Sequence, residues 1–323
     1  MVKTEVLKTL ENNKGCPVSG EAIANELGVS RTAVWKAINT LKKSGYAIET
    51  INGKGYVLST ENDKISREGI LAHIKAPMDI YVYEEVASTN NTAIGIANAT
   101  DPQCALIVAE KQFQGKGRRG REFYSPKDGG IYLSLVVKPK FGMDKSILIT
   151  TAASVAVMQA VKTLTGLDLK IKWVNDLFLE GKKVCGILTE AITDFESGQI
   201  SHVVVGIGIN CFAKDVPPQL KDIVGALNVK GLDRNKLIAL ICDNLLQILD
   251  DISEDNKDFL VQYREASMLI GQEINIFKSY DLDIDKAIPA TAVDIDDNGG
   301  LVVKLEDGTI DTISTGEVSV RLK

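Results

Sequence analysis

The chain has 323 residues, more than one hydrophobic core usually contains, so we expect two or three domains. Apolar residues make up 45% of the sequence and charged residues 25%, a balance that is typical of a globular protein and excludes a disordered chain. The first residues, MVKTEVLKTLENNK, lack the apolar stretch of a signal peptide. No later segment approaches the roughly eighteen uncharged residues of a membrane span. We therefore expect a cytoplasmic protein that does not enter a membrane.

The net charge of −6 is distributed unevenly along the chain. Residues 1–60 carry eight Lys or Arg against five Glu, a net charge of +3, which leaves −9 for the remainder. A basic segment attached to an acidic body is typical of a DNA-binding module joined to a domain with another role. The five cysteines are odd in number and show no C-x-x-C spacing, and there are only two histidines. We therefore expect reduced thiols in or near the core and no metal site built from protein side chains.

The first sixty residues show the pattern of a winged helix-turn-helix. Helices are predicted over 2–13 and around 20–27, followed by a turn and a third helix that Ser30 caps and Gly45 ends. Two short strand patterns then flank the sequence Asn-Gly-Lys-Gly at 52–55, which predicts a wing. Helix, turn, capped helix and basic wing in this order indicate DNA binding. The alternative is a unit that only contacts other proteins.

The third predicted helix has one buried and one open face. Val34, Ile38 and Leu41 form its buried stripe, and Trp35 falls between the two faces. The residues expected to contact DNA are Arg31, Thr32, Trp35, Lys36 and Asn39 on this helix and Lys54 in the wing.

The central part of the chain mixes strand and helix patterns. Apolar runs typical of strands surround a long helical pattern at about 146–164, and Asp233 opens a second long helix. Single long helices after several strands favour an α+β domain with a mixed sheet over a regular doubly wound sheet. The predicted strands are 80–83, 105–110, 131–137, 169–174 and 203–209.

The tail contains only short strand patterns and turns. DDNGG at 296–300 and EDG at 306–308 are hairpin signals, which predicts a small β-barrel of the SH3-like kind. A polar connector, STENDKIS, occupies 59–66. We expect an α+β multidomain protein with a winged helix-turn-helix over 1–62, a central domain over 66–269 and the β domain over 270–323.

The segment AEKQFQGKGRRGREFYSP, residues 109–126, places three glycines among four cationic side chains directly after an apolar strand. Glycine lets the backbone approach an anion closely, and guanidinium groups neutralise phosphate charge. The pattern predicts a polyphosphate-binding loop, although its glycine spacing is neither that of a P-loop nor that of a Rossmann fingerprint. A solvated basic turn and a nucleic-acid patch are the alternatives that these residues alone leave open.

Five short motifs resemble those of the biotin protein ligases. The run GKGRRGR at 115–121 is similar to the signature loop of that family. The four others occur in the family's order: STN at 88–90, KWVND at 172–176, KVCGIL at 183–188 and GIGIN at 206–210. With the winged helix in front and the β-rich tail behind, the chain resembles the bifunctional members, which are also repressors of the biotin operon. Val174 stands where the family commonly has proline, and we expect it to alter the local turn more than the chemistry.

The resemblance implies an ATP-dependent, AMP-forming ligase domain in the centre of the chain. Biotin would be joined to AMP as biotinyl-5′-adenylate with release of pyrophosphate, and then passed to a lysine of an acceptor domain such as a biotin carboxyl carrier protein. Because the first step joins two anions, the site needs cations that offset their repulsion. The expected substrates are ATP and biotin, with Mg²⁺ accompanying the nucleotide.

The same resemblance assigns roles to individual residues. Lys183, Arg118 and Asp176 are the expected catalytic residues, and Asp176 either orients Lys183 or accepts a proton from the acceptor lysine. The alternative for Lys183 is an exposed strand lysine. The residues expected to bind biotin are Ser88, Thr89, Asn90, Gln112, Lys116, Gly117, Arg118 and Lys183. Those expected to bind ATP or the adenylate are Gly115, Arg119, Arg121, Phe123, Asn175, Asn210 and Arg321, with Gly316 and Glu317 helping to close the site.

The resemblance also connects ligation with repression. An acyl adenylate hydrolyses, so the loop 115–124 is expected to close over it. The ordered loop would then favour a homodimer that presents two winged helices to a two-fold operator. Two other functions are a ligand-sensing regulator without ligase activity and a lipoate ligase on the related fold. Lys183 with the full basic loop argues against the first, and the STN segment with that loop favours biotin over lipoate.

Overall fold

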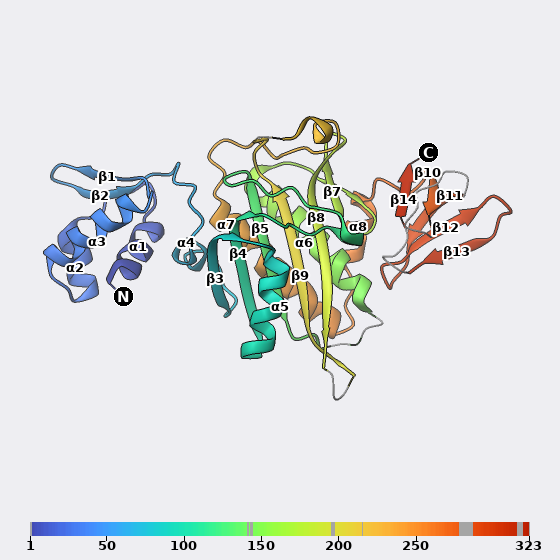
Figure 1. Ribbon diagram of the computed structural model, residues 1–323, viewed down its shortest axis with the longest axis horizontal. Coiled ribbons are helices and arrows are strands. Elements are labelled where there is room, and N and C mark those ends of the chain that lie inside the picture. The colour runs from blue at the N-terminus through green and yellow to red at the C-terminus, as the bar shows by residue number, and fades with distance from the viewer. Residues whose placement is uncertain are drawn as a thin grey trace. The chain divides into compact units, whose positions relative to one another are not determined.

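The computed structural model describes residues 2–140, 142, 145–194, 198–214, 216–277, 287–314 and 319–322. The chain divides into two compact units (Figure 1). Unit 1 consists of Met1–Ala76 and Val229–Leu240, and unit 2 of Pro77–Asn228 and Ile241–Lys323.

Unit 1 contains the expected winged helix-turn-helix. Its helices are α1 (Val2–Asn12), α2 (Gly20–Leu27) and α3 (Arg31–Lys43), and the wing is the antiparallel pair β1 (Ile48–Ile51) and β2 (Gly55–Leu58). Ser30 caps α3, since its side chain accepts a hydrogen bond from the amide of Ala33 at 3.2 Å. Gly28 ends α2 with a φ of 63°, a left-handed conformation that favours glycine.

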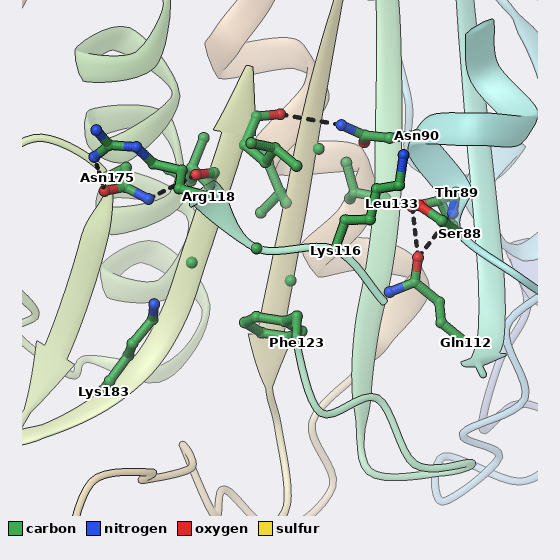
Figure 2. A pocket seen from close by; sticks show the side chains of 17 residues that line it. Ser88, Thr89, Asn90, Gln112, Lys116, Arg118, Phe123, Leu133, Asn175 and Lys183 are labelled. Atoms are coloured by element: carbon green, nitrogen blue, oxygen red, sulfur yellow. Dashed lines mark hydrogen bonds between the residues drawn. The ribbon is translucent and has the colours of Figure 1, made fainter. Parts of the chain in front are cut away.

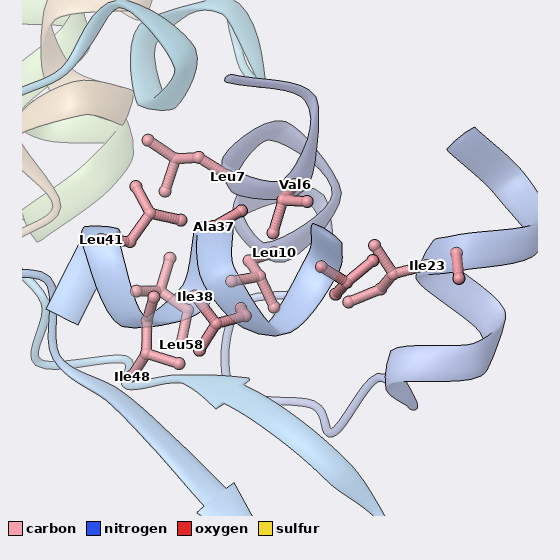
Figure 3. Close-up of a cluster of buried hydrophobic side chains, with 11 residues drawn as sticks. Val6, Leu7, Leu10, Ile23, Ala37, Ile38, Leu41, Ile48 and Leu58 are labelled. Carbon is pink, nitrogen blue, oxygen red and sulfur yellow. The ribbon is translucent and has the colours of Figure 1, made fainter. Parts of the chain in front are cut away.

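One apolar cluster holds the three helices and the wing together (Figure 3). The predicted stripe Val34, Ile38 and Leu41 is buried in it. Trp35, which the sequence left between two faces, is 56% exposed and so lies on the open face. Cys16 is also exposed, which corrects the expectation that all the thiols lie in or near the core.

Unit 1 also contains α4 (Arg67–Leu71) and the start of α7 (Arg234–Ser253). Asp233 accepts a hydrogen bond from the amide of Lys236 at 3.1 Å, as expected of the residue that opens this helix. Glu11 is only 3% exposed, and among the described residues neither of its carboxylate oxygens has a hydrogen-bond partner. Burial raises the pKa of Glu11 from 4.5 to about 7, although Lys14 opposes the shift.

Unit 2 is built around a seven-stranded mixed sheet with the strand order β3-β4-β5-β9-β8-β7-β6. β3 and β4 are parallel, and the other neighbours are antiparallel. The strands are β3 (Asp79–Val86), β4 (Cys104–Gln112), β5 (Gly130–Val137), β6 (Lys170–Lys172), β7 (Asp176–Leu179), β8 (Lys182–Thr193) and β9 (Ile200–Asn210). All five predicted strands overlap this sheet, but β7 and β8 are absent from the prediction.

Helices cover both faces of the sheet (Figure 1). α5 (Thr89–Thr100), which the sequence pattern did not predict, lies on one face, and α6 (Ser146–Thr165) lies on the other. α6 packs against α8 (Phe259–Ala266). Among the described helices, Ile147–Thr165 alone is long and apolar enough to cross a membrane, which corrects the expectation that no segment approaches such a span. Of its apolar window 61% is buried, as in the core helix of a globular protein.

A second, five-stranded antiparallel sheet with the order β13-β12-β11-β10-β14 forms the tail. Its strands are β10 (Glu273–Phe277), β11 (Ile288–Ile295), β12 (Leu301–Leu305), β13 (Ile310–Ile313) and β14 (Ser319–Leu322). The two hairpin signals lie at the β11–β12 and β12–β13 turns. The small β domain is thus confirmed, and its SH3-like barrel form stays a prediction. Trp173 donates its indole N–H to the carbonyl of Gly299 at 2.9 Å.

The raised pKa of Glu11 predicts a pH-dependent stability. Between about pH 4.5 and 7 the unfolded chain loses a proton that the folded chain keeps, so stability falls as the pH rises through this range. The penalty is fully present above about pH 7 and amounts to roughly 3 kcal/mol. Glu11→Gln removes it and should raise the urea midpoint near pH 8 more than near pH 5. Glu5→Gln, at an exposed position of the same helix, is the control. Equal effects of Glu11→Gln at both pH values would contradict the account.

Candidate active site

The floor of one pocket in unit 2 is formed by glycines on β8 and β9. Gly186 pairs with Gly208, and Leu188 pairs with Gly206. A β-carbon on Gly206 would lie 2.2 Å from Oδ1 of Asn90, and one on Gly208 would lie 2.4 Å from the ring of Phe123. The absent side chains therefore make room for groups that reach over the sheet from α5 and from the loop after β4.

The basic glycine loop folds into a tight turn over this floor. The amide of Gly117 donates to the carbonyl of Arg121 at 2.7 Å, and the amide of Phe123 donates to the carbonyl of Gly115 at 2.8 Å. Arg118 donates to Oδ1 of Asn175 at 2.8 Å (Figure 2). The loop is therefore anchored across the pocket by a charged side chain.

Asn175 is itself held in place. Its side-chain nitrogen donates to the carbonyl of Ile187 at 2.8 Å, and its own carbonyl accepts from the amide of Ile187 at 2.9 Å. The amide oxygen of Asn175 is therefore presented in a fixed position to Arg118.

A β-bulge places Lys183 in the pocket. Leu177 pairs with Cys185 but Phe178 pairs with Lys183, so β8 contains one extra residue at this point. In a regular strand positions 183 and 186 would point to opposite faces. Here the ammonium group of Lys183 lies 3.1 Å from where a β-carbon of Gly186 would be, so both face the pocket. The bulge thus turns a strand lysine inward.

The charges at this end of the pocket are unbalanced. Lys183 forms an ion pair with Asp176, with Nζ and Oδ1 2.6 Å apart and both side chains 27% exposed. Burial lowers the pKa of Arg118, and the charge of Asp176 opposes this effect. Two cations thus meet one carboxylate, and no acidic side chain is among the described residues that line the pocket. An anionic ligand would restore the balance.

The other end of the pocket is lined mainly by neutral polar side chains, and the ammonium group of Lys116 is the charged group beside them among the described lining residues (Figure 2). Ser88 is the N-cap residue of α5, but its hydroxyl makes no capping hydrogen bond. Thr89 donates its amide and its hydroxyl to Oε1 of Gln112, at 2.7 and 3.0 Å. Gln112 in turn donates to Ser125 at 3.0 Å. This end suits a neutral ligand group with its own donors and acceptors.

A separate groove lies in unit 1 between α3 and the wing. Arg31, Thr32 and Trp35 line it from the helix and Lys54 from the hairpin. Lys36 is exposed and Asn39 half-buried, and neither is among the described residues that line the groove. Four of the six residues expected to contact DNA therefore share one concave surface.

Known proteins share this arrangement of sequence and fold. Bifunctional ligase/repressor BirA of Bacillus subtilis is 38% identical over 216 residues, which cover 65% of this chain and 66% of that protein, just under two thirds. The protein of the same name from Escherichia coli is 28% identical over 94% of this chain and 92% of its own length. A biotin protein ligase of Aquifex aeolicus, solved in complex with biotin and ATP, is 25% identical, with a TM-score of 0.63 over 76% of this chain and 99% of that one.

Family models match three segments of the chain. The model of the biotin/lipoate A/B protein ligase family matches residues 83–210, an HTH domain matches 3–57, and the biotin protein ligase C-terminal domain matches 282–321. The central domain is therefore similar to the biotin and lipoate protein ligases, and the tail to the C-terminal domain of biotin protein ligases. The order of domains in the chain is that of the bifunctional BirA type.

The structure gathers most of the residues that the sequence assigned to the site. Those that line the pocket are Ser88, Thr89, Asn90, Gln112, Lys116, Gly117, Arg118, Phe123, Asn175 and Lys183. The assigned residues that are not among its described lining are Gly115, Arg119, Arg121, Asn210 and Asp176, although Asp176 holds Lys183. Arg321 lies on β14 and pairs with Asn275, and Gly316 and Glu317 lie outside the described residues.

Two features of the pocket differ from what the sequence suggests. Lys116 points its ammonium group at Oδ1 of Asn91, 2.6 Å away, and not at the end where Arg118 and Lys183 lie. Several strand residues that line the pocket also had no role assigned from the sequence, although two of the five motifs contain all of them except Leu133. These are Leu133, Gly186, Ile187, Leu188, Gly206, Ile207 and Gly208.

The close approach at Gly206 predicts the effect of a single methyl group. Gly206→Ala would push Asn90 from its hydrogen bonds, and such overpacking costs roughly 1 to 3 kcal/mol, or about 5 °C in melting temperature. Gly95→Ala is the control, because Gly95 lies within α5 and has no atom within 4 Å of the added carbon. This helical substitution should leave the melting temperature unchanged or raise it slightly. Calorimetry checks both, and equal melting temperatures for the two variants would contradict the close approach.

Proposed function

We propose that this protein activates biotin with ATP and transfers it to a lysine of a biotin acceptor domain, and that it also represses transcription. The observation that carries the ligase proposal is the two-ended pocket. One end presents Arg118 and Lys183 beside a single carboxylate, and the other presents neutral donors and acceptors from Ser88, Thr89 and Gln112. Biotin has a neutral polar ring and a carboxylate, so it matches both ends at once.

The first step joins two anions. The carboxylate oxygen of biotin attacks the α-phosphorus of ATP, the bond to the β-phosphate oxygen breaks, and pyrophosphate leaves. Arg118 and Lys183 offset the repulsion between the reactants and stabilise the charge of the transition state. We propose that Lys116 exchanges its hydrogen bond with Asn91 for one with the ligand and, with Gly117, joins this group. Gly115, Arg119, Arg121, Phe123, Asn175, Asn210 and Arg321 are proposed to contact the nucleotide.

The second step transfers the acyl group. The acceptor lysine attacks the acyl carbon, the bond to the phosphate oxygen breaks, and AMP leaves. The amine must lose a proton to attack, and Asp176 is the proposed acceptor of that proton as well as the partner of Lys183.

Mg²⁺ is proposed as an ion that accompanies the nucleotide. The described residues include no group of three or more His, Cys, Asp or Glu side chains that could hold a metal. Mg²⁺ is commonly held by substrate phosphates, water and only one or two carboxylates, so its binding does not require such a group. The charge of Mg²⁺ would neutralise part of the negative charge of the pyrophosphate that leaves.

Repression is proposed to follow from the adenylate. When no acceptor consumes the intermediate, the loop 115–124 stays closed and favours a homodimer. The two copies then present the groove of Arg31, Thr32, Trp35 and Lys54 to operator DNA, with Lys36 and Asn39 beside it. We also propose the domain boundaries expected from the sequence, with the winged helix over 1–62, the ligase domain over 66–269 and the β domain over 270–323.

One assay tests the ligase proposal against both alternatives. The purified protein is incubated with ATP, biotin and a biotin carboxyl carrier domain, and pyrophosphate and the biotinylated lysine are measured. A ligand-sensing regulator without ligase activity would release no pyrophosphate and modify no lysine. Lipoate replaces biotin in a second arm, because the matching family includes lipoate ligases. Faster turnover with lipoate would contradict the choice of biotin.

Lys183→Ala should lower the rate of adenylation roughly 100- to 1,000-fold, because it removes a cation aimed at developing negative charge. Lys182→Ala is the matched control. The ammonium group of Lys182, the preceding residue, donates to the carbonyl of Lys221 at 2.9 Å, and its side chain is exposed. The control should keep the normal rate. Normal turnover of Lys183→Ala, measured as pyrophosphate release, would remove Lys183 from the mechanism.

Arg31→Ala should weaken DNA binding roughly tenfold. It should also reduce the slope of the logarithm of the binding constant against the logarithm of the salt concentration by about one, the value for one lost phosphate contact. The probe is a duplex selected from a random library by the protein with biotin and ATP. Lys8→Ala, at an exposed position on α1, is the control and should bind as the unaltered chain does. Pyrophosphate release should stay unchanged in both variants. DNA affinity that is insensitive to Arg31 would place the DNA-binding surface elsewhere.

A further inference from the structure

A network of hydrogen-bonded side chains lies beneath the polar end of the pocket, and it includes two residues that no sequence motif singled out. Ser134, on the fully buried strand β5, is 0% exposed. Its hydroxyl lies 2.6 Å from Oδ1 of Asn90 and 2.8 Å from Oγ1 of Thr89. Glu190, on β8, accepts a hydrogen bond from Nδ2 of Asn90 at 2.6 Å. A hydroxyl buried this deeply destabilises the fold unless it is hydrogen-bonded, and α5 supplies its partners.

The side-chain amide of Asn90 is held in one orientation. Its nitrogen donates to Oε2 of Glu190 and, at 3.3 Å, to the carbonyl of Leu188, and its oxygen faces the hydroxyl of Ser134. If the amide were turned over, its oxygen would face a carboxylate and a carbonyl, neither of which has a proton to donate. Both amide protons of Asn90 therefore already have acceptors inside the protein. Although Asn90 lines the pocket, its donors are directed at the sheet.

Asn90 in turn connects the first turn of α5 to three strands. Ser134 belongs to β5, Glu190 to β8, and Gly206 of β9 leaves the space that the amide oxygen occupies. Thr89, the preceding residue, is fixed to Gln112 on β4. The position of Ser88 and Thr89 thus depends in part on Ser134 and Glu190, which are not among the described residues that line the pocket.

We propose that Ser134 and Glu190 are positioning residues, which act through Asn90 to set Ser88 and Thr89 for the neutral polar head of the ligand. This inference rests on the proposed function, in which that head is the ring of biotin. Hydrogen bonds to a neutral ring are directional, so a small displacement of their donors and acceptors weakens them. Arg118 and Lys183 lie at the other end of the pocket (Figure 2). Loss of the network should therefore weaken the binding of biotin and leave the binding of ATP unchanged.

Kinetics of the full-length protein separate this role from a general loss of stability. Glu190→Ala removes the acceptor for Asn90 and should raise the KM for biotin roughly tenfold. Its KM for ATP and its kcat should stay within about twofold. Glu190→Gln keeps an acceptor oxygen and should restore most of the affinity, with a KM for biotin within about threefold of the unaltered value. Ser134→Ala should raise the KM for biotin roughly fivefold.

Thr189→Val is the matched control. Thr189 precedes Glu190 on β8 but bonds to Thr150 of α6, on the opposite face of the sheet, at 2.9 Å. The Thr189→Val substitution should not change the KM for biotin. The proposal fails if Glu190→Ala leaves that KM unchanged, if the KM values for biotin and ATP rise together, or if Glu190→Gln is as impaired as Glu190→Ala.

Hydrogen exchange distinguishes failure of this proposal from failure of the proposed function. Without any ligand, amide exchange in the peptide 88–95 should be faster in Glu190→Ala and Ser134→Ala than in Glu190→Gln or Thr189→Val. If the unaltered protein releases no pyrophosphate with biotin, the ligase proposal fails and this exchange pattern alone decides the positioning role. Equal exchange in all four variants would overturn it.

Discussion

Arg118 and Lys183 are two cations that share one carboxylate at one end of a pocket, and most of the local structure can be understood as the means of keeping them there. Burial already disfavours the charge of Arg118. Such a group is stabilised by an anion, and two reacting anions need such groups between them. The pocket therefore has an affinity for negative charge before any ligand arrives, and the loop 115–121 spans it through Arg118 and Asn175.

The sheet meets this constraint with unusual backbone at two places. The bulge in β8 turns Lys183 toward the pocket, and the glycines of β8 and β9 leave space for Phe123 and Asn90 above the strands. Neither device adds a functional group. Both determine where functional groups from other segments lie, which is why residues about a hundred positions apart, such as Asn90 and Glu190, come into contact.

These devices also explain what the sequence could predict. The winged helix was predicted because Ser30, the stripe of Val34, Ile38 and Leu41 and the wing glycines each follow local rules of capping, periodicity and turns. The buried strands β4, β5 and β9 were predicted because they are continuous apolar runs. β8 was missed for a physical reason: its pocket face carries Lys183, Gly186 and Glu190, so apolar periodicity is interrupted where the site is built. α5 was missed for a similar reason: it consists largely of small and polar residues, so it lacks the apolar periodicity that predicts a helix.

From the sequence, the site could be assigned only for residues whose own side chain or backbone is expected to contact the ligand. The basic loop and Lys183 are recognisable because the cations stand beside glycines or in a motif. Ser134 and Glu190 act through Asn90, and nothing in the sequence connects positions on three separate elements. The supporting hydrogen bonds needed the three-dimensional structure, since a serine within a strand is unremarkable until its neighbours are known.

A crystal structure with biotin and ATP bound tests the central claim most directly. The account predicts that the loop 115–121 closes on the ligands, with the guanidinium of Arg118 and the ammonium of Lys183 about 3 Å from carboxylate and phosphate oxygens. The ring of biotin should lie at the end formed by Ser88, Thr89 and Gln112. A complex with both ligands in place, but with the loop and Lys183 directed away from them, would contradict it.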